Sequence, residues 1–102
     1  ERIMVYPIYV KDSKIHEAID EEVSRATCKF PFWPNRAIDA ASIVAEEAGE
    51  IVKAVNEMVY EFPKSTIEDV EKEAIQTAAM CIRFLKSLEK YDYTPSEQHK
   101  QD

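Results

Sequence analysis

The sequence predicts an all-α fold, and three observations support this prediction. Apolar residues recur at steps of three and four along most of the segment from residue 12 to residue 90, which is helical spacing. One glycine and five prolines are too few turn-forming residues for a sheet of many strands. The two longest periodic segments are joined by a few residues around Pro63, so we expect an antiparallel helical hairpin.

The chain of 102 residues has the length of one domain, which we expect to span residues 1–90. A core of this size is thin, and a small helical chain with long apolar stripes often completes its core by pairing with a second copy. We therefore expect a bundle core, such as a four-helix bundle, that is completed by oligomerisation.

The N-terminal part of the chain is expected to hold an extended arm and a short helix. Residues 1–11 include the apolar stretch "RIMVYPIYV", in which Pro7 excludes a regular helix; an edge strand is the alternative. Asp12 or Ser13 can cap a first helix that ends near Cys28. The apolar stripe of this helix consists of Ile15, Ile19, Val23 and Ala26.

The loop "KFPFWPN" at 29–35 separates this helix from the hairpin. Asn35 is the expected N-cap of a long helix from about Arg36 to residue 60 or 61. Ser65 and Glu68 match a capping box, and the third helix is expected from about residue 66 to residue 90. The polar residues 91–102 lack periodicity, so we expect a flexible C-terminal tail.

The composition excludes several classes of protein. A formal net charge of -7 and the lack of a basic stripe argue against binding to a nucleic-acid polymer. No apolar run is long enough for a membrane span and no signal peptide is recognisable, so we expect a cytoplasmic protein without a membrane partner. Cys28 and Cys81 lie far apart in sequence, which predicts buried free thiols rather than a zinc or redox pair.

Carboxylates interrupt the apolar face of both hairpin helices. In the first helix of the hairpin, one face carries Ile43, Glu47, Glu50, Ala54 and Met58. In the second, the line through Phe84 and Met80 continues to Gln76, Glu73 and Asp69. Because residues at similar depths of an antiparallel hairpin face each other, Glu47 and Glu50 are expected to meet Glu73 and Gln76.

Converging carboxylates need either water or a cation. An ionised carboxylate that is removed from water without a partner costs several kcal/mol. One interpretation is therefore a solvated acidic face without a function, and the other is a site for a hard divalent cation, which prefers oxygen ligands. Gly49 lies beside these glutamates and permits close approach of a ligand or of another helix.

These motifs resemble a known family. "EEAGE" at 46–50, a gap of 22 residues and "EAIQTAAMCIRFL" at 73–85 are similar to the MazG-like, all-α nucleoside triphosphate pyrophosphohydrolases, whose signature is E-x-x-E followed by E-x-x-D. The resemblance covers about residues 32–88. The family is itself similar to phosphoribosyl-ATP pyrophosphohydrolases and dimeric dUTPases, so the nucleotide stays open.

The resemblance implies a metal site. At matching positions of the family, Glu47, Glu50 and Glu73 bind Mg²⁺, with Mn²⁺ as a possible substitute. Gln76 stands where the family has aspartate. Its amide oxygen is still a ligand type, but the loss of a charge leaves three outcomes open: weaker metal binding, a shift of the ligand to Glu46 or Asp69, or an inactive member.

The resemblance also implies a reaction, the hydrolysis of a nucleoside triphosphate between its α and β phosphorus atoms to the monophosphate and pyrophosphate. Glu46 or Glu47 is expected to accept the proton of the attacking water, with Asp69 as an alternative. Lys53 lies one turn beyond the carboxylate pair and is a candidate for pyrophosphate neutralisation; its alternative is an ordinary surface lysine.

The aromatic loop is the candidate for base recognition. Trp33 or Phe32 can stack on a base, with Lys29 or Asn35 at its polar edge; the alternative is a hydrophobic plug at the end of the hairpin. A homodimer or homotetramer is the expected assembly. Two rival functions remain, a non-catalytic dimerisation or regulatory module in which Gln76 has weakened the metal site, and an acidic interaction partner whose carboxylates serve only solubility.

Overall fold

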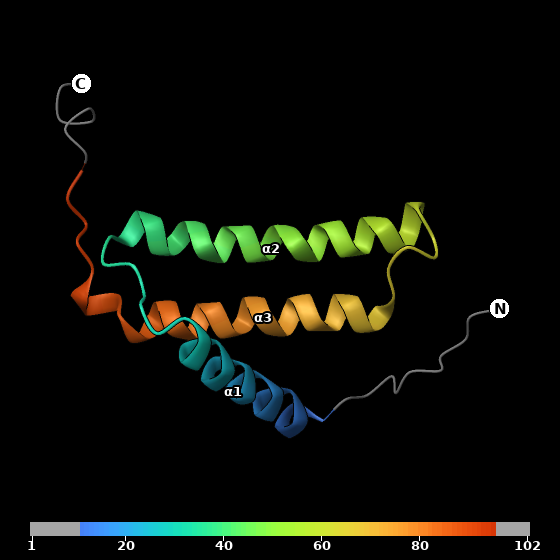
Figure 1. Ribbon diagram of the computed structural model, residues 1–102, viewed down its shortest axis with the longest axis horizontal. Helices are drawn as coiled ribbons and strands as arrows, with labels where there is room; N and C mark the ends of the chain where they lie inside the picture. Colours follow the sequence, from blue (N-terminus) through green and yellow to red (C-terminus); the bar gives the residue numbers. More distant parts are fainter. Residues whose placement is uncertain (1–10, 96–102) are drawn as a thin grey trace.

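The computed structural model describes residues 11–95 and places them in three α-helices (Figure 1). Helix α1 spans Asp12–Lys29, α2 spans Ala37–Tyr60 and α3 spans Ile67–Lys86, and a short 3₁₀ helix, η1, follows at Leu88–Lys90. The described residues contain no strand, and their only ladder-type contact is an isolated bridge between Arg36 and Asp92. The all-α prediction is confirmed; the predicted N-terminal arm lies almost wholly outside the described residues.

Helices α2 and α3 run antiparallel and side by side, and α1 packs obliquely against α3 near the end where the hairpin is open (Figure 1). The N-terminal part of α1 diverges from the hairpin, so the molecule is elongated, with extents of 58 × 30 × 22 Å. Because α1 contacts α3 rather than lying along both helices, one broad side of the hairpin stays uncovered.

Two predicted N-caps differ in the structure. Lys11 is the N-cap of α1 and makes no side-chain capping bond. Asp12 lies in the first turn of the helix, where its negative charge interacts favourably with the positive end of the helix dipole. Arg36 is the N-cap of α2, also without a side-chain bond. Asn35 instead uses its backbone carbonyl, which accepts a hydrogen bond of 2.9 Å from the amide of Asp92.

The capping box of α3 is shifted by one residue from its predicted position. Thr66 accepts a hydrogen bond from the amide of Asp69 (3.3 Å), and the Asp69 carboxylate accepts from the amide of Thr66 (2.9 Å). The segment contains two overlapping matches to the motif, and Ser65 is the buried member. Ser65 donates to Glu57 of α2 (3.0 Å), so its hydroxyl is directed towards α2, and Thr66 makes the capping bonds.

The predicted end of the third helix and the predicted start of the tail both differ from the structure. Helix α3 ends at Lys86 rather than near residue 90. Tyr91, predicted to begin a flexible tail, is buried, with only 7% of its surface exposed. The amide of Ala37 donates to the carbonyl of Asp92 (3.1 Å), which fixes this segment to the start of α2. The domain therefore extends past residue 90; residues 96–102 lie outside the described part of the chain.

The core is small and lies where α1 meets the hairpin. Its buried residues are Val23 and Ala26 of α1 and Ala79 and Met80 of α3. The partly buried residues packed against them are Ile19, Trp33, Ile43 and Val44. Among the described residues, no large side chain is fully buried. This agrees with the predicted thin core.

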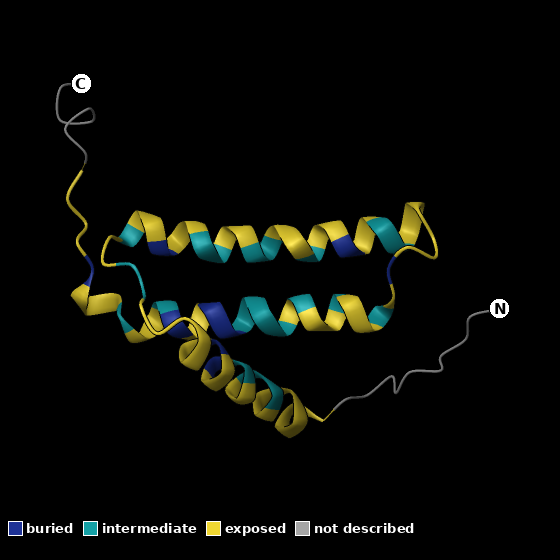
Figure 2. Ribbon diagram, in the orientation of Figure 1, coloured by how far each residue is buried: buried dark blue, intermediate teal, exposed yellow. Residues whose placement is uncertain are grey.

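Many residues of the two hairpin helices are exposed (Figure 2), and several of them are large and apolar. On α2 and α3 the exposed residues include Ile38, Val52, Val55, Val59, Ile82 and Leu85. Cys28 and Cys81 are also exposed, so the prediction of buried thiols is wrong for the single chain. Cys28 lies near the end of α1, and Cys81 lines an open groove between α2 and α3. No helix in the described region combines the length and apolar character needed to cross a membrane.

Candidate functional site

Carboxylates from all three helices approach Glu47. Glu47 lies on the inward side of α2 and is half-buried. Burial raises the pKa of its carboxyl group most, and neighbouring negative charges raise this pKa further. In decreasing order, these charges belong to Glu73, Glu46, Glu50 and Glu22. The largest of these charge effects comes from Glu73 of α3, so the two hairpin helices do bring carboxylates together at this depth.

Two cavities divide the four predicted metal ligands. The first, of about 370 Å³, is called the Trp33 cavity here and is lined by residues that include Glu47 and Gln76. The second, of about 290 Å³, is called the acidic cavity and is lined by residues that include Glu50 and Glu73. The electrostatic effect of Glu73 on Glu47 links the two, so the predicted ligands belong to one region but not to one pocket.

The four predicted ligands are of the type that a hard cation prefers, but their side chains are not placed together as a coordination site. Three carboxylates and one amide offer only oxygen ligands, the type that Mg²⁺ and Mn²⁺ prefer. A cation would relieve the repulsion that raises the pKa of Glu47. Within residues 11–95, however, no three His, Cys, Asp or Glu side chains are placed to hold a metal ion together. The residues therefore fit the cation by chemistry, and its binding would require glutamate side chains to rotate.

The remaining acidic candidates occupy different positions. Glu46 is exposed and lines neither cavity, although its charge contributes to the raised pKa of Glu47. Asp69 lines the acidic cavity but also serves the capping box of α3. Lys53 is exposed and lines the same cavity as Glu50 and Glu73, and its role with pyrophosphate stays a prediction.

Trp33 both packs in the core and lines a cavity. Its indole N–H donates to the hydroxyl of Tyr91 (2.6 Å), which in turn donates to the carbonyl of Phe84 (3.0 Å). The guanidinium of Arg83 lies 4.7 Å from the ring centroid of Trp33, within cation–π range. Trp33 thus has the contacts of the predicted hydrophobic plug, while another part of it remains on the cavity wall.

The three other residues proposed for base recognition are spread apart. Phe32 lines the Trp33 cavity and is 91% exposed, so it is not part of a plug. Lys29 lines neither cavity but a separate groove between α1 and α3, and its ammonium lies 5.5 Å from the ring centroid of Phe30. Asn35 is exposed and lines neither cavity, and its carbonyl is bonded to Asp92. Only Phe32 therefore accompanies Trp33.

Helix α1 and the connection between α2 and α3 add residues that the sequence analysis missed. Glu22 lines the Trp33 cavity, where Arg25 holds both of its carboxylate oxygens at 2.9 and 2.6 Å. The hydrogen bond from Arg25 lowers the pKa of Glu22, against the opposing effect of burial. Lys64 lines the acidic cavity. The i, i+3 spacing of Glu22 and Arg25 was the available signal for this pair; no local pattern points to Lys64.

Comparisons with models of protein families, with curated proteins and with solved structures gave no match. The resemblance to MazG-like pyrophosphohydrolases therefore depends on the two acidic motifs and on their helical context.

Proposed function

We propose that this protein is a metal-dependent nucleotide pyrophosphohydrolase that converts a nucleoside triphosphate to the monophosphate and pyrophosphate. The observation that carries the proposal is the approach of Glu47 on α2 to Glu73 on α3, between a cavity with aromatic walls and a cavity with acidic walls. A nucleotide has the matching two parts, an aromatic base and a polyphosphate that binds divalent cations.

Each cavity has a chemical role in this proposal. Glu47, Glu50, Glu73 and Gln76 would hold Mg²⁺, and this ion supplies charge neutralisation of the phosphates and polarisation of the attacking water. Glu47 is the better proton acceptor of the two predicted bases, because it lines a cavity whereas Glu46 does not. Trp33 and Phe32 provide apolar surface for the base in a cavity whose volume lies in the usual range for small-molecule sites.

A second copy of the chain completes the bundle in this proposal. A groove of about 380 Å³ with almost purely apolar walls lies between α2 and α3 and includes Val44, Cys81 and Leu85. Three further apolar residues of α2, Val52, Val55 and Val59, are also exposed. Pairing of two hairpins would bury these residues in a four-helix bundle, as a homodimer or as half of a homotetramer.

One observation favours a second candidate function, a non-catalytic dimerisation module. The described residues include no preassembled group of metal-binding side chains, and Gln76 reduces the negative charge of the site. A chain that retained the scaffold but had lost the metal would keep the exposed apolar surface of the hairpin and would not hydrolyse nucleotides.

Pyrophosphate release from a panel of nucleotides, with Mg²⁺ or with a chelator, separates the two functions. We expect chelator-sensitive turnover of at least one nucleotide and loss of more than 90% of it (roughly tenfold or more) in Glu50→Gln. Glu89→Gln is the matched control, because Glu89 is exposed in η1 and belongs to neither cavity. Normal folding without turnover or Mg²⁺-dependent stabilisation would contradict the enzyme and favour the module.

A further inference from the structure

The acidic cavity contains positive as well as negative side chains. It is lined by Glu50, Glu57, Asp69, Glu73, Lys53 and Lys64, together with smaller residues. Glu50 and Glu73 are the ligands proposed for the metal. Lys53 and Lys64 are the cationic side chains on the wall of this cavity. They would therefore face a polyphosphate whose metal is held by Glu50 and Glu73.

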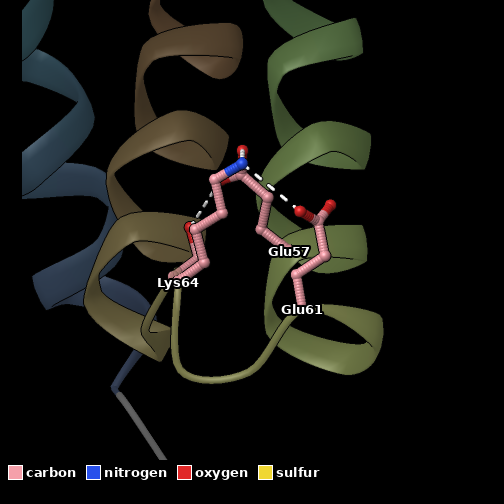
Figure 3. Close-up of polar contacts among 4 residues, drawn as sticks. Glu57, Glu61 and Lys64 are labelled. Atoms are coloured by element: carbon pink, nitrogen blue, oxygen red, sulfur yellow. Dashed lines mark hydrogen bonds and ion pairs between the residues drawn. The ribbon is translucent and has the colours of Figure 1, made fainter.

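Lys64 is positioned from the connection between α2 and α3 (Figure 3). Its ammonium lies 3.3 Å from Glu61 and 3.7 Å from Glu57, one carboxylate on the end of α2 and one a turn earlier. Glu57 is itself held, because the buried hydroxyl of Ser65 donates to its other carboxylate oxygen at 3.0 Å. Glu57 is thus an anchored carboxylate beside the ammonium of Lys64, whose own side chain is 58% exposed.

The two ion pairs of Lys64 are not equivalent. The side chain of Glu57 is 16% exposed and lines the cavity, whereas that of Glu61 is 54% exposed and lies outside it. An ion pair between exposed side chains contributes little to stability, so the contact with Glu61 is easily given up. Pyrophosphate, which carries several negative charges, is a stronger partner for an ammonium group than one solvated carboxylate.

We propose that Lys64 is a binding residue for the β- and γ-phosphates of the substrate and for pyrophosphate, and that it exchanges its contact with Glu61 for these groups. This inference rests on the proposed function, because it places the phosphates in the acidic cavity. Lys64 already lines the cavity, 3.7 Å from Glu57, so binding requires movement of only the end of the side chain.

Binding of inorganic pyrophosphate tests this role without requiring turnover. Calorimetry with and without Mg²⁺ should show about tenfold weaker binding to Lys64→Met than to the unmodified chain, the effect of losing one hydrogen bond to a charged group. Lys86→Met is the matched control, because Lys86 is exposed at the opposite end of α3 and lines neither cavity. Equal affinities of the two variants, or no binding by the unmodified chain, would overturn the inference.

Glu61→Gln separates phosphate binding from a purely structural role of Lys64. If the lysine only ties the end of the hairpin, both Glu61→Gln and Lys64→Met lower the melting temperature and neither changes the affinity for pyrophosphate. The proposed exchange predicts opposite changes, with tighter binding in Glu61→Gln because the competing carboxylate is removed. Weaker or unchanged binding in Glu61→Gln would contradict the exchange.

Turnover measurements distinguish failure of this inference from failure of the proposed function. If the unmodified chain hydrolyses a nucleotide and Lys64→Met leaves KM and inhibition by pyrophosphate unchanged, the enzyme stands and the role of Lys64 is wrong. If pyrophosphate binding depends on Lys64 but no nucleotide is hydrolysed, the phosphate site stands and the proposed reaction is wrong.

Discussion

The aromatic loop and the acidic middle of the hairpin satisfy their polar groups in different ways. In the loop, the indole of Trp33, the hydroxyl of Tyr91 and the guanidinium of Arg83 each have a partner within the chain. In the middle of the hairpin, Glu47 is half-buried, and the charges that act on its pKa are all negative. One region is complete as a single chain, whereas the other contains a repulsion that a cation would remove.

This difference suggests how stability and function are divided in the molecule. The Trp33–Tyr91 bond and the two backbone bonds of Asp92 join the segment before α2 to the segment after η1. The carboxylates lie on long regular helices that need no contribution from these side chains to form. Substitutions in the two regions should therefore change the free energy of unfolding in opposite directions.

Loss of Trp33 should produce the largest effect. Trp33→Ala removes an indole that packs on the core, bonds to Tyr91 and stacks on Arg83, so we expect destabilisation of about 3 kcal/mol. Denaturant unfolding followed by circular dichroism measures this change. Phe32→Ala is the control in the same loop, because its ring is 91% exposed. A similar loss in both variants would mean that Trp33 is not a structural anchor.

Replacement of Glu47 should have a smaller effect of the opposite sign. Glu47→Gln keeps the size of the side chain and removes a like-charge repulsion, which is worth about 0.5 kcal/mol between helix neighbours. We expect a more stable metal-free protein that has lost the proposed activity. Glu89→Gln, in η1, should change neither property.

The pH dependence of this difference follows from the raised pKa of Glu47. Above its folded-state pKa, the ionised carboxylate destabilises the native chain, so Glu47→Gln has its full advantage there. As pH falls through that pKa, the carboxyl group becomes neutral first in the folded state, and the advantage has disappeared once pH is below the ordinary value of 4.5, where the group is neutral in both states. A thermal-unfolding series across this range measures the change, and a difference that grew on acidification would contradict the assignment.

The sequence was sufficient for the helices because their periodicity is local. It was insufficient where a choice depended on distant residues. The capping box forms at Thr66 while Ser65 is bonded to Glu57 of α2, and the buried Tyr91 is bonded to Trp33, 58 positions away. Neither contact leaves a pattern in the nearby residues.

The sequence predicted how far along the hairpin the candidate site lies, but it did not predict that the site residues are divided between two cavities. Two glutamates three positions apart differ by about 60° around a helix, because each residue turns about 100°. In an antiparallel pair this rotation places Glu47 with Gln76 on one side and Glu50 with Glu73 on the other, as the two cavities have them. The spacing alone suggested one shared face, because it ignored this rotation.

The smallest effect on the stability of the metal-free fold is expected for Gln76→Asp. This substitution tests whether residue 76 is a ligand of the proposed cation. A new carboxylate beside Glu47 in the Trp33 cavity should destabilise the metal-free chain by about 0.3 kcal/mol through repulsion. Adding Mg²⁺ should reverse the order, because a hard cation binds a carboxylate more strongly than an amide oxygen. The measured quantity is the rise in melting temperature with Mg²⁺.

Asn56→Asp is the matched control for this experiment, because it adds the same charge at an exposed position of α2 outside both cavities. A larger response to Mg²⁺ in Gln76→Asp than in Asn56→Asp would assign residue 76 to the metal, since general attraction of a cation to an acidic protein affects both variants equally. Equal responses would mean that the cation does not contact residue 76. The proposed cation site in the middle of the hairpin would then consist of Glu47, Glu50 and Glu73 alone.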